Sequence, residues 1–306
     1  MNEFELIARL TQSLPGNAQV VVGAGDDCAV LDLGGADSLV LFKTDAVVEG
    51  IHFTRETAPE LVGRKALARC LSDIAAMGGT PVAAVVTLGL PAGFDPEFVA
   101  KIYEGLNTLA RKYGVAIVGG ETTANPGGIL LSAALLGTVR RGKQILRTGA
   151  KPGDAVFVTG ELGGSPAGRH LEFEPRLEEA RWLAGHFSIH AMIDLSDGLA
   201  GDLRHLLQAG GLGAELLTDA IPVSAAAKRR AGQTAPLTAA LTDGEDFELL
   251  FTVAGGDAVK LLDAWKAEFR GLKLTCIGKI VAGAGITLRN KSGSRPLDAQ
   301  GYEHFK

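Results

Sequence analysis

Cysteine is scarce in this 306-residue chain, which has only Cys28, Cys70 and Cys276. No two of them have the spacing of a metal-binding pair, and an odd number argues against a disulfide framework. We therefore expect reduced, buried thiols in a cytoplasmic protein. The N-terminal segment MNEFELIARL agrees with this location, because it carries acids where a secretory signal peptide carries bases.

Long apolar runs are missing too. The uncharged stretch Ile74–Phe94 is interrupted by Gly-Pro-containing turns, and the stretch Thr122–Val139 is interrupted at residues 125–128. A membrane-spanning helix needs about 20 continuous apolar residues. We therefore interpret both stretches as buried strands with turns and expect no membrane partner.

Basic residues are not in excess, since 30 Lys and Arg stand against 35 Asp and Glu and the net charge is −5. Sequence-independent binding of nucleic acid requires a basic surface, so we expect no nucleic acid partner. An acidic protein can still bind phosphates through metal ions or backbone amides. The chain is 46% hydrophobic and 21% charged, which is typical of a globular protein, and its length predicts about two domains.

Familiar catalytic motifs are also missing: there is no GxxxxGK[ST] phosphate loop, no HRD set of protein kinases and no HExxH. The glycine-rich segment Gly160–Gly168 has two interpretations. It is either a tight turn before a helix, which we favour, or a loop whose amides near Gly163 and Gly164 bind a phosphate.

What the sequence does have is an alternation of strands and helices with short links. Before residue 140 the patterns predict helices at 3–14, 59–77 and 96–113, and strands at 20–22, 29–33, 38–44, 82–90, 115–118 and 129–139. The basic, turn-rich segment that follows is typical of a domain boundary. Beyond it we expect strands at 155–159, 214–217, 247–253 and 274–280, and helices at 175–184, 199–209 and 258–269. The sequence therefore predicts an α/β (α+β) protein of two domains, residues 1–140 and 150–306.

Acidic residues recur where apolar runs meet Gly-bounded turns, as in GAGDD, KTDAVVEG, LSDIAAMGG, GGETT and IDLSDGL. Strand ends are where α/β proteins build their sites. Any one of these acids is explained as a turn or cap former. Adjacent acids such as Asp26 and Asp27 repel each other unless water or cations relieve them. Five such turns together predict a Mg²⁺ site, because Mg²⁺ binds a few carboxylates plus substrate phosphates.

Eight motifs in order resemble those of the thiamine-monophosphate kinases. That family carries GIGDD, TDTLVEGxHF, NLSDLAAMGA, GGDTT, TRxGAKxGD, IDISDGL, GGEDYEL and GxDHF. The chain has GAGDD (23–27), TDAVVEGIHF (44–53), LSDIAAMG (71–78), GGETT (119–123), LRTGAKPGD (146–154), IDLSDGL (193–199), GEDFEL (244–249) and GYEHF (301–305). Each motif alone is weak, but eight collinear ones from about residue 3 to 305 are specific.

The resemblance implies the two-domain fold of the aminoimidazole ribonucleotide synthetase-like superfamily. Its N-terminal sheet-helix domain dimerises through the sheet, and ATP and Mg²⁺ lie in the cleft toward a C-terminal α/β domain. The implied activity is the ATP-dependent phosphorylation of thiamine monophosphate to thiamine diphosphate. The implied protein is a cytoplasmic homodimer that uses several Mg²⁺ ions and has small molecules as its other partners.

The same resemblance assigns the site residues. Metal would be held by Asp27, Thr44, Asp45, Asp73, Glu121, Asp194 and Asp197. ATP would be contacted by Tyr103, Gly120, Glu121, Arg147 and Ser196. Thiamine phosphate would be contacted by His52, Glu245 and Tyr302. The catalytic residues would be Asp73, Arg147 and Asp197.

The chemistry agrees with these assignments. Phosphoryl transfer depends on positioning and charge neutralisation, and the acceptor is a phosphate monoester that needs no strong base. We expect direct in-line transfer, steadied by Arg147. Tyr302 would stack on thiamine and Glu245 would attract its cationic ring, although a Tyr that packs the tail and a solvated Glu remain open alternatives.

Four positions depart from the family pattern. Cys70 and Asp243 replace an Asn and a Gly. Glu121 replaces an Asp and extends its carboxylate by about 1.5 Å. Lys43 stands where Ser or Thr is usual. Because Mg²⁺ tolerates little geometric error, we expect fewer ions than in relatives, with the Lys43 ammonium at a metal position, unless Lys43 points outward from its strand.

Two other interpretations remain. One is a different ATP-dependent member of the superfamily, although neither a reactive Cys beside Lys near the N-terminus nor a C-terminal Cys is present. The other is a degenerate nucleotide-binding protein without turnover. Retention of Asp27, Asp45, Asp73, Asp194, Asp197 and Arg147 argues against it.

Overall fold

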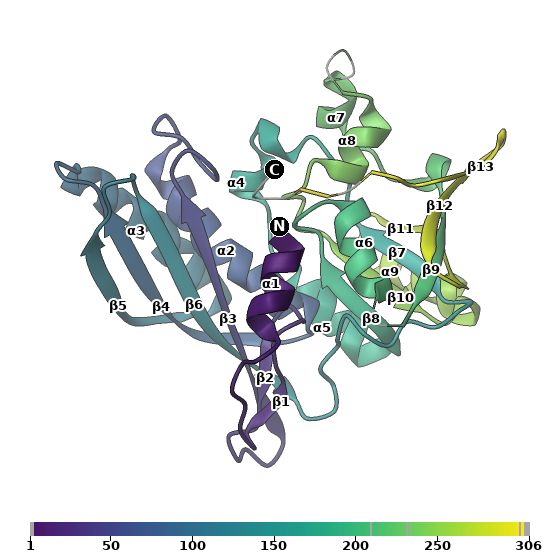
Figure 1. Cartoon of the computed structure of the whole chain (residues 1–306), viewed down its shortest axis with the longest axis horizontal. Helices are drawn as coiled ribbons and strands as arrows, with labels where there is room; N and C mark the ends of the chain where they lie inside the picture. Colours follow the sequence, from purple (N-terminus) through teal and green to yellow (C-terminus); the bar gives the residue numbers. More distant parts are fainter. Residues whose placement is uncertain (1–2, 209, 231, 233, 300, 303–306) are drawn as a thin grey trace.

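The computed structural model describes residues 3–208, 210–230, 232, 234–299 and 301–302. The strands form two sheets, one in each half of the chain, and the linker between them runs from residue 141 to 154. Figure 1 shows the two sheets side by side, with helix α2 (Pro59–Ala76) between the first sheet and the second half. Of the described helices, none is long and apolar enough to cross a membrane.

The first sheet has six strands in the order β1-β2-β3-β6-β4-β5. Only β4 and β5 are parallel, and helix α3 (Pro96–Tyr113) connects them; the other pairs are antiparallel. A further helix, α1 (Glu3–Thr11), precedes the sheet. The strands are β1 (Val20–Val22), β2 (Ala29–Leu31), β3 (Ser38–Val48), β4 (Thr80–Leu90), β5 (Ala116–Ala124) and β6 (Leu130–Arg140).

Helices α2 and α3 cover one face of this sheet (Figure 1). They cross closely because glycines stand at the contact: a Cβ on Gly63 would lie 1.8 Å from the carbonyl oxygen of Ile102, and one on Gly105 would lie 1.8 Å from that of Glu60. Asp95 caps the start of α3, and Gly114 ends it in the left-handed conformation. Most of α2 is buried, since its other side packs against the second half of the chain.

The other face of the sheet is open. Side chains alternate along a strand, so Leu39 and Leu41 face the helices while Phe42 faces away. Phe42 pairs with Leu136, and both are exposed, as is Val85 on β4. Three large apolar side chains therefore lie on one uncovered face, which we call the open face.

The second sheet has seven strands in the order β13-β12-β9-β11-β7-β10-β8. Its strands are β7 (Ala155–Thr159), β8 (Ile189–Asp194), β9 (Leu212–Leu217), β10 (Leu249–Val253), β11 (Leu274–Ala282), β12 (Gly285–Asn290) and β13 (Gly293–Pro296). Its helices are α4 (Arg169–Glu172), α5 (Leu177–His186), α6 (Leu199–Gln208), α7 (Ala225–Arg229), α8 (Pro236–Thr242) and α9 (Ala258–Glu268), with short 3₁₀ turns at Ser165–Ala167, Thr218–Ala220 and Gly255–Asp257.

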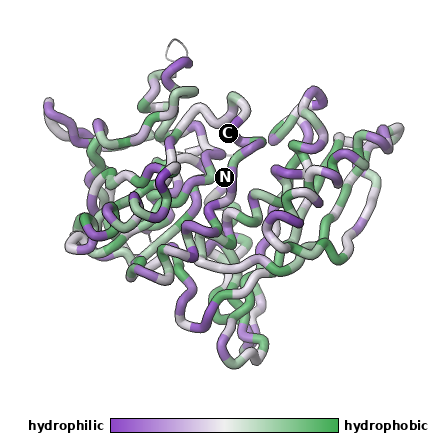
Figure 2. Tube along the Cα trace, turned by 180° about the vertical axis from the view of Figure 1, so that it is seen from behind, coloured by the Kyte–Doolittle hydropathy of each residue, from purple (hydrophilic) through white to green (hydrophobic). Residues whose placement is uncertain are grey.

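One apolar core joins the two halves. Its buried members include Leu71 of α2 and Met77 directly after this helix, together with Phe157, Phe251 and Trp265 of the second half. Figure 2 shows apolar segments in the strands of both sheets. Burial at about 25 cal/mol per Å² makes this shared core the main force holding the halves together.

Most predicted elements are present, but three acids do not lie in the predicted turns. Asp45 is inside β3, Asp73 is in the last turn of α2, and Glu121 is inside β5. The expectation of turns was wrong because pairing with β6 and β4 carries β3 and β5 through these motifs. Strands β8, β12 and β13 and helices α4, α7 and α8 were also not predicted. Residue 209 and residues 303–305 of the last motif lie outside the described residues.

Candidate functional site

Three buried carboxylates meet where the halves of the chain join. Asp27 comes from the turn after β1, Asp73 from α2 and Asp194 from the end of β8. One oxygen of each lies within 4.8 Å of the others. We call these three residues the acid cluster; the sequence had predicted all three as metal ligands.

The acid cluster carries more negative charge than its surroundings neutralise. Burial raises the pKa of all three carboxyls, to about 6 for Asp194 and well above the ordinary value for Asp73. The Oδ2 atom of Asp27 is buried and has no hydrogen-bond partner among the described residues. Carboxylate oxygens whose negative charge is not neutralised by nearby cations are suitable ligands for a hard divalent cation such as Mg²⁺.

Arg147 binds the acid cluster from the linker. Its Nη2 and Nε lie 2.6 and 3.1 Å from Asp27 Oδ1, and its backbone N–H donates to the Asp26 carboxylate. The turn that presents Asp27 is thereby fixed to the linker. Burial opposes the charge of Arg147, but Asp27 outweighs it and the pKa of the guanidinium is raised.

Two more cations lie beside the cluster. Lys43 Nζ lies 2.9 Å from Asp73 Oδ1 and 3.8 Å from Asp45 Oδ2. Arg69 Nη2 lies 3.6 Å from Asp45 Oδ1. Burial alone would raise the pKa of Asp45, but Lys43 and Arg69 outweigh it and the pKa is lowered. Lys43 therefore points toward the acids, and the alternative that it points outward from its strand is wrong.

Ser72 and Asp202 support the acids and were not predicted. Ser72 Oγ donates to Asp194 Oδ2 at 2.6 Å. The buried Asp202 accepts from the backbone N–H of Asp197 at 3.1 Å and so holds the turn that carries Asp197. Ser72 belongs to the LSD motif and Asp202 follows IDLSDGL, so only the motif context could have pointed to them.

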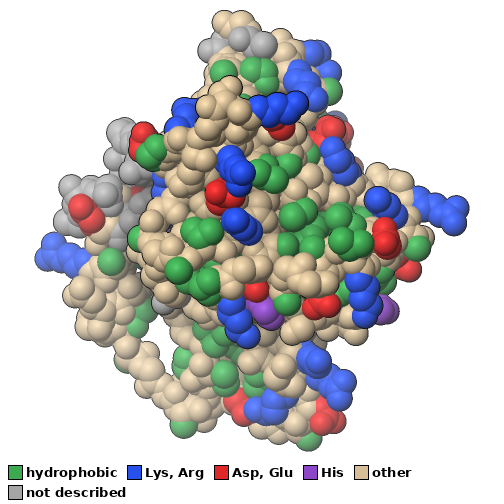
Figure 3. All heavy atoms as spheres, turned by 90° about the vertical axis from the view of Figure 1, so that its right-hand side faces the viewer, with side chains coloured by type: hydrophobic (Ala, Val, Ile, Leu, Met, Phe, Trp, Pro, Cys, Tyr) green, Lys and Arg blue, Asp and Glu red, His purple; other side chains and the backbone are tan. Residues whose placement is uncertain are grey.

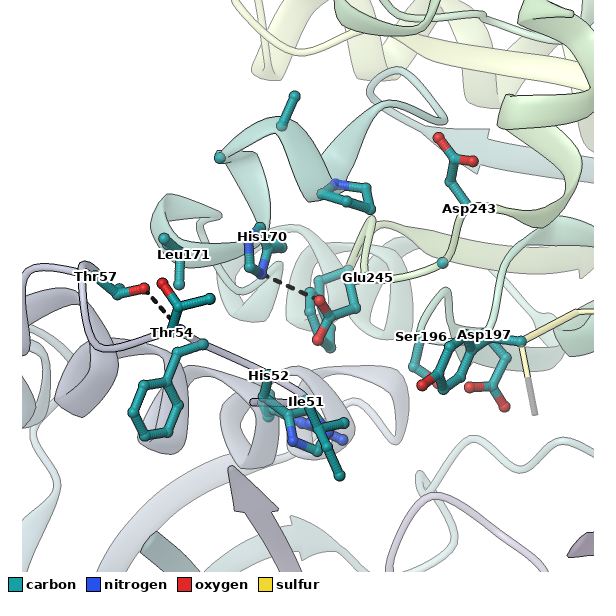
Figure 4. Close-up of a pocket in the computed structure, with 18 of the residues that line it drawn as sticks. Ile51, His52, Thr54, Thr57, His170, Leu171, Ser196, Asp197, Asp243 and Glu245 are labelled. Carbon is teal, nitrogen blue, oxygen red and sulfur yellow. Dashed lines mark hydrogen bonds and ion pairs between the residues drawn. The ribbon is translucent and has the colours of Figure 1, made fainter. Parts of the chain in front are cut away.

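Next to the acids lies a cavity of about 670 Å³, a volume suited to a small organic ligand. Figure 4 shows residues of four segments around it: the loop at 50–57, the turn before and including α4, the loop at 196–197 and the loop at 243–245. Arg69, which contacts Asp45, also lines it. The predicted site residues on its walls are His52, Ser196, Asp197, Glu245 and Tyr302.

Glu245 is held in this cavity by two bases that the sequence did not reveal. The fully buried Lys65 has its Nζ 2.7 Å from Glu245 Oε1, and His170 Nδ1 lies 3.1 Å from Oε2. Figure 4 shows the His170 contact as a dashed line. Burial would raise the pKa of Glu245, but these partners lower it to about 2. Glu245 is therefore a carboxylate at any physiological pH, and the alternative of a freely solvated Glu is wrong.

The loop that carries Glu245 is strained and anchored. Glu245 and Phe247 have positive φ, at 53° and 49°, which costs of the order of 1 kcal/mol each. Backbone hydrogen bonds from both to Ser196 and Leu195 hold the loop in place. Strain of this kind is typical of sites where the backbone is forced to present a side chain.

The glycine-rich segment 160–168 forms a tight turn, which is the interpretation that the sequence favoured. The N–H of Gly163 donates to Asp246 and that of Gly164 donates to Asp243. These amides already have carboxylate partners, so the alternative of a phosphate loop is wrong.

Four predicted site residues lie neither beside the acid cluster nor on the cavity wall. Thr44 alternates with Lys43 and Asp45 and so lies on the open face, where its hydroxyl contacts that of Ser132 at 3.2 Å. Glu121 pairs through Thr87 with Ser132 and lies on the same face. Thr44 and Glu121 are therefore separated by the sheet from the acid cluster.

The other two are Tyr103 and Gly120. Tyr103 is half-buried on α3 and packs against the apolar clusters. A Cβ on Gly120 would lie 1.9 Å from the carbonyl oxygen of Val86, so the β4–β5 pairing accounts for glycine there. Their predicted contact with ATP stays a prediction.

Comparison with known proteins agrees with this architecture. The family model of the N-terminal domain of AIR synthase related proteins matches residues 25–139, and the model of their C-terminal domain matches residues 151–291. The two matches cover the two halves of the chain and assign it to the class of AIR synthase related proteins.

Relatives narrow the class to one family. The chain is 43% identical to the thiamine-monophosphate kinase of Rhodopirellula baltica over 96% of this chain and 93% of that protein. It is 35% identical to the enzyme of Salmonella typhimurium, over 99% and 98%. The chain belongs to the thiamine-monophosphate kinase family.

A solved structure gives the same result. The fold matches that of AaThiL complexed with AMPPCP and TMP, with a TM-score of 0.84 and 31% identity over 99% of this chain and 97% of that one. The similarity covers both halves of the chain.

Proposed function

We propose that this protein is a kinase that transfers the γ-phosphoryl group of ATP to thiamine monophosphate, giving thiamine diphosphate and ADP. The observation that carries this proposal is the acid cluster next to a cavity that holds an ionised Glu245. Full-length similarity to thiamine-monophosphate kinases and to a structure with an ATP analogue and TMP supports it.

The acid cluster would hold Mg²⁺ through Asp27, Asp73 and Asp194. When bound there, the ion would neutralise charge on the phosphates of both substrates. Asp197, on the turn next to Asp194, lines the cavity and would act between the ion site and the acceptor. Ser196 lies on the same turn and would contact ATP.

The chain supplies positioning rather than a nucleophile. The acceptor is a phosphate that is already largely ionised, so we propose direct transfer without a phosphoenzyme. Arg147 has five N–H donors, of which Asp27 takes two. The others would steady the transferred group by charge-assisted hydrogen bonds.

Recognition of thiamine would fall to the cavity. The carboxylate of Glu245 would attract the thiazolium, and Tyr302, which also lines the cavity, would stack on a ring. His52 accepts a hydrogen bond at Nδ1 from the N–H of Val48, which orients its ring on the cavity wall, where it would contact the substrate.

The test is to incubate the purified protein with thiamine monophosphate, ATP and MgCl₂ and to separate the thiamine esters. Thiamine diphosphate should form from the monophosphate and not from free thiamine, and AMPPCP should not replace ATP. No product despite ATP binding would contradict the proposal and favour the degenerate nucleotide-binding protein.

We propose further that the protein is a homodimer that associates through the open face. Phe42, Val85 and Leu136 expose 45, 42 and 41% of their surface there, and an apolar sheet face of this kind favours burial against a second copy. Thr44 and Glu121 lie on the same face, so their predicted contacts with metal or ATP would depend on the interface.

Sedimentation measures this association. The wild type should have twice the chain mass of 31.7 kDa, and Leu136→Asp should lower it to one chain. The matched control is Val259→Asp, which changes a side chain exposed on α9 and should leave the mass unchanged. A wild type of one chain mass would contradict the dimer.

For its location and partners we propose the cytoplasm and small molecules. The three cysteines are free, as expected in a reducing compartment. On the face in Figure 3, basic side chains alternate with acidic ones instead of forming the continuous basic surface that nucleic acid requires.

A further inference from the structure

Lys43 is the feature of the site that the proposed function does not explain. It lies on the helix-facing side of β3, and its ammonium reaches the carboxylates of Asp73 and Asp45. Its side chain is 23% exposed, so it is inserted among the acids and is not a solvated surface lysine. A strand that lines an ion site would ordinarily present an oxygen ligand there.

Around this position the chain supplies fewer cations than carboxylates. The four carboxylates of Asp27, Asp45, Asp73 and Asp194 face three cationic side chains, namely Lys43, Arg69 and Arg147. Arg147 contacts Asp27, and Arg69 contacts Asp45. Lys43 alone lies between Asp45 and Asp73, where it relieves the repulsion of two acids that are also in contact with each other.

We propose that the Lys43 ammonium is a built-in cation that occupies the position of a divalent ion between Asp45 and Asp73. The chain then binds one ion fewer than its acids would otherwise hold, and the remaining site is the acid cluster of Asp27, Asp73 and Asp194. This inference rests on the proposed function only in taking these acids to be an ion site.

The charge supplied in this way differs from that of a metal. An ammonium has one positive charge and three donors, and it has no coordination position for a phosphate oxygen. Lys43 therefore relieves the acids permanently but cannot bridge them to a substrate. Removing it should open a cation position with at least two carboxylate ligands.

The experiment counts Mn²⁺ bound per chain, by electron paramagnetic resonance of free Mn²⁺, in the presence of AMPPCP. Lys43→Ser should bind one Mn²⁺ more than the wild type. Lys43→Arg, the matched control, keeps the charge and should bind the same number as the wild type. Equal counts in the wild type and Lys43→Ser would overturn the proposal, as would Mn²⁺ between Asp45 and Asp73 of a wild-type crystal with Lys43 turned to solvent.

Thermal unfolding provides a second measurement if Lys43→Ser is unstable without metal. The increase in Tm on adding Mn²⁺ should be larger for Lys43→Ser than for the wild type, because the ion replaces the lost charge. An equal increase would overturn the proposal. Formation of thiamine diphosphate by the wild type, measured in parallel, tests the proposed function separately, since counting ions needs no turnover.

Discussion

The carboxyl groups of the acid cluster and the carboxyl group of Glu245 in the neighbouring cavity have pKa values that are shifted in opposite directions. In the cluster, burial raises the pKa of Asp27, Asp73 and Asp194. In the cavity, Lys65 and His170 lower the pKa of Glu245 to about 2. Both regions are buried, so the difference comes from the number of cations that the chain supplies for each carboxylate.

This difference in pKa shift indicates which of the two regions is suited to bind a metal ion. The cavity is balanced within the chain and is fixed before any ligand arrives, which limits the cost of ordering it. The cluster is left with more carboxylates than cations, so a bound divalent cation would stabilise it further. The chain's own side chains therefore form the binding site for the organic substrate, whereas a bound metal ion would supply the positive charge that phosphoryl transfer needs.

The largest effect should follow from Asp73→Asn, which removes the carboxylate shared by the cluster and Lys43. We expect kcat/KM to fall by about a thousandfold or more, because charge stabilisation of the transition state is lost. The count of bound Mn²⁺ should fall as well. Asp263→Asn changes an exposed acid on α9 and should leave both quantities unchanged; a small loss in Asp73→Asn would contradict the role of the cluster.

Asp246 gives the pH dependence of the Glu245 loop. Burial raises its pKa to about 6, although Arg169 and the N–H of Gly163 oppose this. Because the folded-state pKa lies above the ordinary value of 3.8, its contribution to stability is complete below about pH 4 and is lost as the pH rises through about 6. The total is roughly 3 kcal/mol.

Asp246→Asn removes this titration. Between about pH 4 and pH 6, Tm of the wild type should fall more steeply with rising pH than Tm of Asp246→Asn. Since Asp194 titrates in the same range in both proteins, the difference between the two curves isolates Asp246. Parallel curves would show that Asp246 keeps an ordinary pKa.

Glu245→Gln tests recognition in the cavity. The carboxylate that attracts the thiazolium is lost while the shape is kept, so KM for thiamine monophosphate should rise about 30-fold, equivalent to about 2 kcal/mol. The value of kcat should change much less. Glu178→Gln, at an exposed position of α5, is the control. A fall in kcat with KM unchanged would indicate that Glu245 acts in the phosphoryl-transfer step. It would contradict the distinction between a cavity that binds the substrate and a cluster that supports catalysis.

The sequence predicted the acids, with Lys43 and Arg147 among them, but not the other side chains that pair with them. Motifs placed Asp27, Asp73 and Asp194 because each follows a local apolar run. The cations and donors come from distant parts of the chain: Lys65 meets Glu245 across 180 residues and Ser72 meets Asp194 across 122. Periodicity reports only local structure, so such pairs appear only when the two halves pack together.

The fold was predictable to a similar degree. Helix α2 was predicted from its apolar face and α3 from its place in the alternation of strands and helices, and the bounds of both agree within about a residue. Strand β8 was not, because Ile189–Asp194 has no strict alternation and forms by pairing with β10. The face on which Thr44 and Glu121 lie depends on register, which only the paired strands determine.

The smallest effect should follow from Ser72→Ala, which leaves every charge in place. The Ser72 hydroxyl orients Asp194 at 2.6 Å, and loss of such a supporting hydrogen bond weakens metal sites about tenfold. We expect the Mn²⁺ affinity to fall by that factor while KM for thiamine monophosphate is unchanged, with the exposed Ser292→Ala as control. A rise in KM with unchanged Mn²⁺ affinity would contradict the acid cluster as the ion site. If the cluster binds the ion and the cavity binds thiamine monophosphate, a change in the orientation of the Asp194 carboxylate should alter metal binding alone.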